Sequence, residues 1–195
     1  MATLALNKSV LKRERERLAR FRRFLPSLDL KRKQLVAEFN RARKTLAERD
    51  QELERYLEGK GSLMALVGAS GMDLSGLVRA QSVKIKDENI LGVNVPSVEV
   101  AEFQVQEYST LARPFWVDFL VEAVKGMALL RIQRQVEAER VSRLRRAVRR
   151  ITQRVNLFEK VLIPSAQRNI QRISVFLADA DRAAVVRSKI AKARH

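Results

Sequence analysis

The distribution of glycine is the feature that most constrains what this chain can fold into. All seven glycines lie between Gly59 and Gly126, so the 58 residues before them and the 69 residues after them contain none. Glycine inside a helix costs about 1 kcal/mol relative to alanine, and its absence allows a long segment to remain helical without interruption. The sequence therefore predicts two long helical arms joined by a compact middle segment.

The N-terminal arm carries a heptad repeat in which eleven of fourteen positions are apolar or aromatic. A repeat of this length indicates a coiled coil, because only a helix packed along its length keeps such a stripe away from water. Pro26 removes one backbone hydrogen bond, but Leu25 and Leu28 keep the register across it, so we predict a kink there and not a loop. The two series are Leu11, Leu18, Leu25, Arg32, Phe39, Leu46 and Leu53, and Glu14, Phe21, Leu28, Leu35, Ala42, Arg49 and Tyr56.

The C-terminal arm repeats the pattern, with one irregularity. Three consecutive steps of four residues occur between Phe158 and Ile170, and such a stutter locally unwinds a coiled coil. Pro164 lies within it. Since the middle segment joins two rods, we expect the arms to pair antiparallel, with both termini at the end away from that segment. The predicted positions are Val141, Leu144, Val148, Ile151, Val155, Phe158 and Leu162, followed by Ala166, Ile170, Ile173, Leu177, Ala180 and Ala184.

The middle segment predicts a small head with a short helix and a β-hairpin. Valine and isoleucine alternate with polar residues over about 82–96, and Asp87, Glu88 and Asn89 are candidate turn formers. Trp116, near the start of the second long helix, either anchors the core of the head or lies on an exposed docking face. The expected organisation is a shaft helix over 1–58, a head over 59–113 and a second shaft helix over 114–195, which makes the fold mainly α.

The net charge of +17 arises in the arms. Residues 1–58 contain 16 basic and 9 acidic side chains, residues 59–126 contain 6 and 8, and residues 127–195 contain 17 and 5. Such a field favours an acidic partner, which nucleic acid, an anionic membrane surface or an acidic protein could provide. Charge alone does not choose among the three.

The residue types needed for catalysis are missing or misplaced. The chain has no cysteine, its single histidine is His195, and no phosphate-binding loop motif occurs, so we expect no catalytic residue, cofactor or metal site. The longest uncharged run, residues 61–72, is shorter than the roughly 20 residues that cross a bilayer. With no secretory signal pattern at its start, the chain is expected to be cytoplasmic and not inserted in a membrane.

Two stretches go beyond periodicity, namely Arg154 to Pro164 (RVNLFEKVLIP) and Glu88 to Pro96 (ENILGVNVP). Both resemble the D subunits of the V-type and archaeal A-type rotary ATPases. A third similarity is Lys8 to Leu11 followed by a basic helix and Leu30 to Leu35 (LKRKQL), so the resemblance spans nearly the whole chain. The sequence departs from the family pattern at Pro26 and in the tail after Leu177, where the family tends to be more acidic.

The resemblance implies a non-catalytic central rotor shaft, which couples ATP hydrolysis or synthesis in a hexamer of A and B subunits to ion transport. Its implied partners are the A, B and F subunits and a membrane-side adaptor, and its implied location is the cytoplasmic face of the membrane. The candidate hexamer contacts are Arg143, Arg145, Arg146, Arg149, Arg150, Arg154, Asn156 and Pro164. The candidate coupling residues of the head are Val83, Ile85, Ile90, Gly92, Val95 and Trp116.

Other interpretations remain open at this point. The arginines of the C-terminal arm could form only a solvated charged face. A basic coiled coil could also bind nucleic acid through its phosphates, although no aromatic residues interleave with the densest basic run, Arg143 to Arg150. A self-assembling scaffold or a membrane-surface filament protein is a third possibility.

Overall fold

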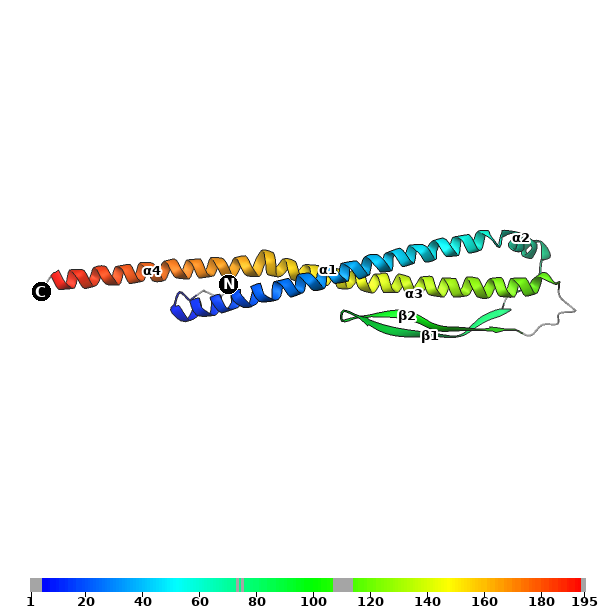
Figure 1. Ribbon diagram of the computed structural model, residues 1–195, viewed down its shortest axis with the longest axis horizontal. Helices are drawn as coiled ribbons and strands as arrows, with labels where there is room; N and C mark the ends of the chain where they lie inside the picture. Colours follow the sequence, from blue (N-terminus) through cyan, green and yellow to red (C-terminus); the bar gives the residue numbers. More distant parts are fainter. Residues whose placement is uncertain (1–4, 73, 75, 107–113, 194–195) are drawn as a thin grey trace. The chain divides into compact units, whose positions relative to one another are not determined.

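The computed structural model describes residues 5–72, 74, 76–106 and 114–193, so residues 107–113 at the end of the predicted head lie outside the described residues, as does His195. The elements are helix α1 (Lys8–Glu58), helix α2 (Gly61–Ser70), strands β1 (Val78–Ile90) and β2 (Val93–Val105), helix α3 (Trp116–Leu157), the π-helical turn η1 (Phe158–Leu162) and helix α4 (Ile163–Ala193) (Figure 1). The fold is mainly α with a single hairpin among the described residues, as predicted.

The heptad positions of α1 form its packed face. All fourteen are buried or partly buried, and Leu35 and Ala42 are almost fully enclosed. Asn7 caps the helix, since its side-chain Oδ1 accepts a hydrogen bond from the backbone N–H of Val10 at 2.8 Å. The helix continues through Pro26 without a break, so the prediction that this proline does not create a loop is confirmed.

The chain divides into two compact units. The first contains residues 1–33 and 149–195, and the second contains residues 34–148. In the first unit α1 runs antiparallel to η1 and α4, because Glu14 contacts Asn169 whereas Phe21 contacts Phe158. The stripe predicted for α4 is wrong at its end, since Ala180 and Ala184 are exposed.

The π-helical turn coincides with the predicted stutter. The backbone N–H of Ile163 donates to the carbonyl oxygen of Phe158, five residues earlier, instead of to the residue four earlier. Pro164 follows immediately. A proline has no N–H to donate, and its ring crowds the carbonyl four residues before it, so the wider turn relieves strain that Pro164 would impose on a regular α-helix. The predicted irregularity is therefore confirmed.

The second unit contains the β-hairpin, α2, α3 up to Val148 and the second part of α1. In this unit α1 and α3 are antiparallel neighbours, because Asp50 pairs with Arg134 at 2.5 Å and the Tyr56 hydroxyl donates to the Ala123 carbonyl at 3.2 Å. The two strands of the hairpin run beside α3 (Figure 1). Their apolar ends, α2 and the start of α3 enclose a small core made of Leu77, Trp116, Val117, Leu120 and Val121.

The predicted turn of the hairpin is wrong, because Asp87, Glu88 and Asn89 lie within β1 and pair with β2. The turn is formed by Leu91 and Gly92, with φ angles of 53° and 81°. Two positive φ angles match the twist of the flanking strands, and this favours a two-residue loop. Asn89 supplies the local support, since its Oδ1 accepts a hydrogen bond from the Gly92 N–H at 3.0 Å.

Candidate interaction surfaces

The arginines of α3 fall into two groups, and the first group is held within the chain. Arg143 donates through Nε to Glu139 at 3.0 Å and through Nη1 to the carbonyl oxygen of Asn94 at 3.2 Å, and it approaches Asp87 at 3.3 Å. Arg146 shares the same Glu139 oxygen at 3.2 Å. Arg143 therefore links α3 to both strands of the hairpin, and it is only partly exposed.

The charges of this network reinforce each other. The hydrogen bond from Arg143, together with Arg146, lowers the pKa of Glu139 below its ordinary value. The hydrogen bond with Glu139 likewise raises the pKa of Arg143, and Asp87 adds to the effect. A further ion pair joins Arg140 to Glu88 at 3.5 Å. The end of the hairpin near its turn is thus attached to α3 by charge-assisted contacts, which are stronger than neutral hydrogen bonds.

The second group of arginines points to solvent. Arg145, Arg149, Arg150 and Arg154 are exposed, and none of them has a hydrogen bond or ion pair with another residue in the described ranges. The buried positions of the same helix include Leu144, Ala147, Ile151 and Val155, so the four arginines lie outside the packed face. Each of them leaves a positive charge without an acidic partner in the described part of the chain.

The remaining two candidates of the C-terminal arm lie around the π-helical turn. Asn156 is partly exposed, two residues before the turn, and Pro164 follows it and is also partly exposed. Beside them Leu157 and Val161 are about half exposed. The turn thus presents apolar side chains to solvent next to the outward arginines Arg150 and Arg154.

The head candidates occupy different environments. Val95 is fully buried and Ile90 is partly buried, whereas Gly92 lies in the exposed turn. Val83 and Ile85 border a groove between the hairpin and α3, with a volume of about 570 Å³. Other side chains that line it are Pro96, Ile132, Val136, Glu139 and Arg143.

Trp116 belongs to the core of the head, with 9% of its surface exposed, so the core alternative is confirmed. Its neighbours Phe115 and Phe119 instead expose 79% and 66% of their surfaces. The packed face of the helix is centred on Val117, Leu120, Val121 and Val124, and Phe119 lies away from it. Spacing from Trp116 alone does not reveal this, because three residues is also a helical spacing. Helix α2 behaves similarly, with Leu63 and Val67 packed against the core and Met64 and Leu66 exposed.

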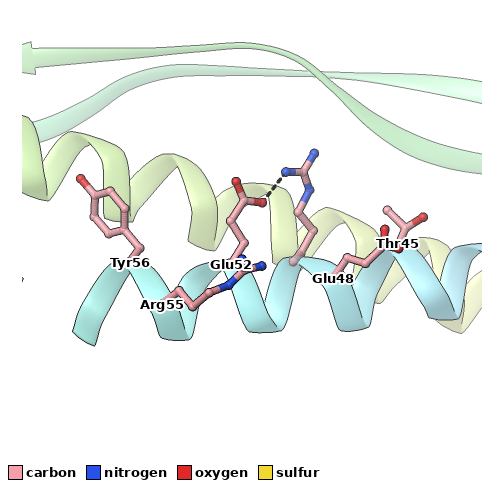
Figure 2. A pocket seen from close by; sticks show the side chains of 6 residues that line it. Thr45, Glu48, Glu52, Arg55 and Tyr56 are labelled. Carbon is pink, nitrogen blue, oxygen red and sulfur yellow. Dashed lines mark hydrogen bonds and ion pairs between the residues drawn. The ribbon is translucent and has the colours of Figure 1, made fainter. Parts of the chain in front are cut away.

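A polar depression of about 590 Å³ lies along α1 in the second unit (Figure 2). It is bordered by Thr45, Glu48, Arg49, Glu52, Arg55 and Tyr56. Arg49 and Glu52 pair at 2.6 Å across one helical turn, as the dashed line in Figure 2 shows. The charges that line this depression therefore include a pair that is already matched.

Neither a metal site nor a membrane span is found among the described residues. They contain no group of three or more histidine, cysteine, aspartate or glutamate side chains that could hold a metal ion. No helix within the described ranges combines the length and the apolar character that crossing a membrane requires.

Long antiparallel helix pairs, with heptad contacts and a hairpin packed on one helix, define an α-helical coiled-coil protein. The family model for ATP synthase D subunits matches residues 10–193 of this chain. The chain belongs to this family.

Curated relatives agree over nearly the full length, and all three described here are V-type ATP synthase D subunits. The relative from Borreliella burgdorferi is 33% identical over 192 residues, which cover 98% of this chain and 95% of the relative. The relative from Chlamydia pneumoniae is 33% identical over 192 residues, with 96% and 90% covered. The one from Chlamydia muridarum is also 33% identical over 192 residues, with 97% and 94% covered.

Proposed function

We propose that this chain is the central rotor shaft of a V-type or A-type rotary ATPase. In this role it couples ATP hydrolysis or synthesis in a hexamer of A and B subunits to ion transport through the membrane ring. The ATP chemistry belongs to the hexamer, and the chain contributes a stiff, asymmetric helix pair. An asymmetric rod inside a ring of three similar sites makes the sites inequivalent, so rotation takes each site through binding, reaction and release.

The observation that carries the proposal is the set of outward arginines on α3. Arg145, Arg149, Arg150 and Arg154 have no acidic partner in the described part of the chain, whereas Arg143 and Arg146 are already held by Glu139. The proposed partners of the four are acidic loops that line the hexamer. Arginine suits this role because its planar guanidinium binds a carboxylate through two hydrogen bonds.

The free end of α4 supports insertion into a protein ring. A groove between α1 and α4 is lined by side chains from residues 8–16 and 174–181, and α4 continues beyond these residues to Ala193. In this extension Val185, Val186 and Ile190 are each more than half exposed. An isolated helix end gains little stability without packing, so an apolar lining of the hexamer is its proposed environment.

The head is proposed to bind the other subunits of the stalk. Phe115, Phe119 and Leu66 are exposed and directly precede core-packing residues in the sequence, so they offer apolar surface to a second protein. Exposed aromatic residues often anchor interfaces. The proposed partners of the head are the F subunit and the membrane-side adaptor. The complex then holds the chain at the cytoplasmic face of the membrane, without insertion.

Charge reversal tests the arginine surface. Changing Arg145, Arg149, Arg150 and Arg154 to glutamate in the assembled complex is expected to lower ion transport per ATP hydrolysed at least about twofold, because close charge pairs at interfaces contribute to both affinity and register. The matched control changes the same four residues to lysine, which keeps the charge and removes the planar guanidinium. Unchanged coupling in the glutamate variant would contradict the proposed contact.

Copurification tests the assignment as a whole. A tagged copy of this chain is expected to isolate the A, B and F subunits from native membranes. Affinity for duplex DNA that falls steeply with salt, with no binding to an A/B hexamer, would instead support a nucleic-acid-binding coiled coil.

A further inference from the structure

One carboxylate lies in the packed face of the first unit. Glu14 is only 8% exposed, and it is the one charged residue that is buried among the described residues. Asn169 of α4 donates to its Oε2 at 3.3 Å, and Arg17 approaches its Oε1 at 3.5 Å. A buried carboxylate is tolerated only where hydrogen bonds and charges compensate for the lost water, so this position favours one particular arrangement of the two helices.

The same stretch of α1 makes a second contact with the other helix. The Phe21 and Phe158 rings meet edge to face, with centroids 5.3 Å apart and planes at 76°. The Arg17 guanidinium lies 5.4 Å from the centroid of the Phe21 ring, so it joins the two contacts. Phe158 begins the π-helical turn, and Asn169 lies in α4 beyond Pro164.

The two contacts therefore lie at either end of the stretch of chain that contains the π-helical turn and Pro164. A π-helical turn contains one more residue than the α-helical turn it replaces, and one residue corresponds to about 100° of rotation along a helix of 3.6 residues per turn. If the extra residue were lost or moved, α4 would turn about its axis relative to α1. Glu14 would then lie near Arg168 or Ile170 instead of Asn169. Neither of these side chains carries an amide that could donate to Glu14 as Asn169 does.

We propose that Glu14 and Asn169, together with Phe21 and Phe158, form a two-point clamp that fixes the rotational setting of α4 across the π-helical turn. These are positioning residues. The clamp prevents α4 from twisting independently of α1, so a torsional load applied to α4 is carried by the helix pair. Only this last consequence depends on the proposed rotor function.

The test uses the absence of cysteine from the natural chain. Arg13→Cys and Arg172→Cys place nitroxide labels at exposed positions on α1 and α4, and pulsed electron paramagnetic resonance measures the distance between them. The full-length chain with its natural Glu14 and Asn169 is expected to give one narrow distance distribution. Glu14→Leu with Asn169→Leu is expected to broaden this distribution at least about twofold, because the apolar pair no longer selects one rotation of α4.

Three comparisons make the result specific. Glu14→Gln keeps hydrogen-bonding capacity toward Asn169, so the distance distribution of this variant is expected to stay as narrow as that of the natural chain. Glu16→Leu with Gln167→Leu likewise replaces one carboxylate and one amide side chain by leucine, but at exposed positions, so it is expected to leave the distribution unchanged. The melting temperature of the Glu14→Leu, Asn169→Leu variant is expected to equal or exceed that of the natural chain, because an apolar pair replaces a buried polar one.

A distribution as narrow as that of the natural chain in the double leucine variant would overturn the clamp. So would equal broadening in the exposed control, or a loss of helical circular dichroism that accounts for the broadening. Ion transport per ATP hydrolysed, measured in the assembled complex, distinguishes the clamp from the proposed rotor function. A broadened distribution with unchanged ion transport per ATP would leave the clamp in place and contradict its role in transmitting torque.

Discussion

The contact between Gly126 and Tyr56 gives a sharp prediction about stability. A Cβ at position 126 would overlap the Tyr56 hydroxyl oxygen and lie 2.8 Å from its Cζ, which is closer than real Cβ atoms approach other atoms. In Gly126→Ala the tyrosine must move, and its hydrogen bond to the Ala123 carbonyl is lost. Gly126 is therefore expected to be required by the close approach of α1 to α3.

Three contributions decide how much Gly126→Ala changes the free energy of unfolding. Alanine favours the helix by about 1 kcal/mol relative to glycine. Overpacking typically costs about 1–3 kcal/mol, and loss of the tyrosine hydrogen bond costs about 1 kcal/mol. We expect Gly126→Ala to destabilise the chain by about 1–3 kcal/mol net, and each kcal/mol corresponds to a fall in melting temperature of about 2–4 °C for a chain of this size.

A double-mutant cycle with Tyr56→Phe isolates the clash. Phenylalanine lacks the hydroxyl but keeps Cζ, whose close approach to the added Cβ offsets the gain in helix propensity. Gly126→Ala is therefore expected to be neutral within about 0.5 kcal/mol in that background, and the two changes should couple by about 1–3 kcal/mol. Thermal and urea denaturation followed by circular dichroism provide the measurement. Gly68→Ala is the control, because an added Cβ there meets nothing within 4 Å and should stabilise α2. Stabilisation by Gly126→Ala in both backgrounds would refute the predicted contact.

Three further predictions concern the hairpin. Leu91→Gly should stabilise the turn by about 1 kcal/mol, because a left-handed backbone costs a leucine about that much; urea denaturation that shows no gain would contradict it. Arg143→Ala should increase amide hydrogen exchange near Asp87 and Asn94 several-fold but leave exchange in α2 unchanged, since it removes the attachment to α3 near the turn. The lowered pKa of Glu139 means that the stabilisation from its contacts is complete above the ordinary carboxyl pKa and is lost as the pH falls through the lowered value. Glu139→Gln should therefore flatten the loss of melting temperature as the pH falls below the ordinary carboxyl pKa, and an unchanged slope would count against the network.

The long helices could be predicted from the sequence because heptad periodicity is a local pattern that packing along a helix requires. The same reasoning failed at Ala180 and Ala184, since the spacing of a stripe does not reveal where its partner helix begins. The turn of the hairpin was missed because Leu91 is a poor residue for a positive φ angle, and the polar run Asp87 to Asn89 fits turn preferences better. Pairing with β2 overrides those preferences.

The candidate surfaces were less accessible to prediction. Six arginines look equivalent in the sequence, yet Arg143 and Arg146 are held by Glu139 and the other four are not. This difference depends on helix phase and on Asp87, which is distant in the chain. The importance of Glu14 was likewise hidden, because a glutamate in an apolar series looks like an interruption until its partner on α4 is known.

The hairpin has a consequence for the behaviour of the free chain. Its sheet contains only two strands among the described residues, so each strand has one edge whose backbone hydrogen-bonding groups find no third strand there. Such edges invite pairing with strands of other molecules. Lys84, Lys86, Glu99 and Glu102 place exposed charges along the ribbon and oppose that pairing. We therefore expect that replacing the two lysines by threonine would promote self-association of the purified chain, although neither side chain contributes to the core.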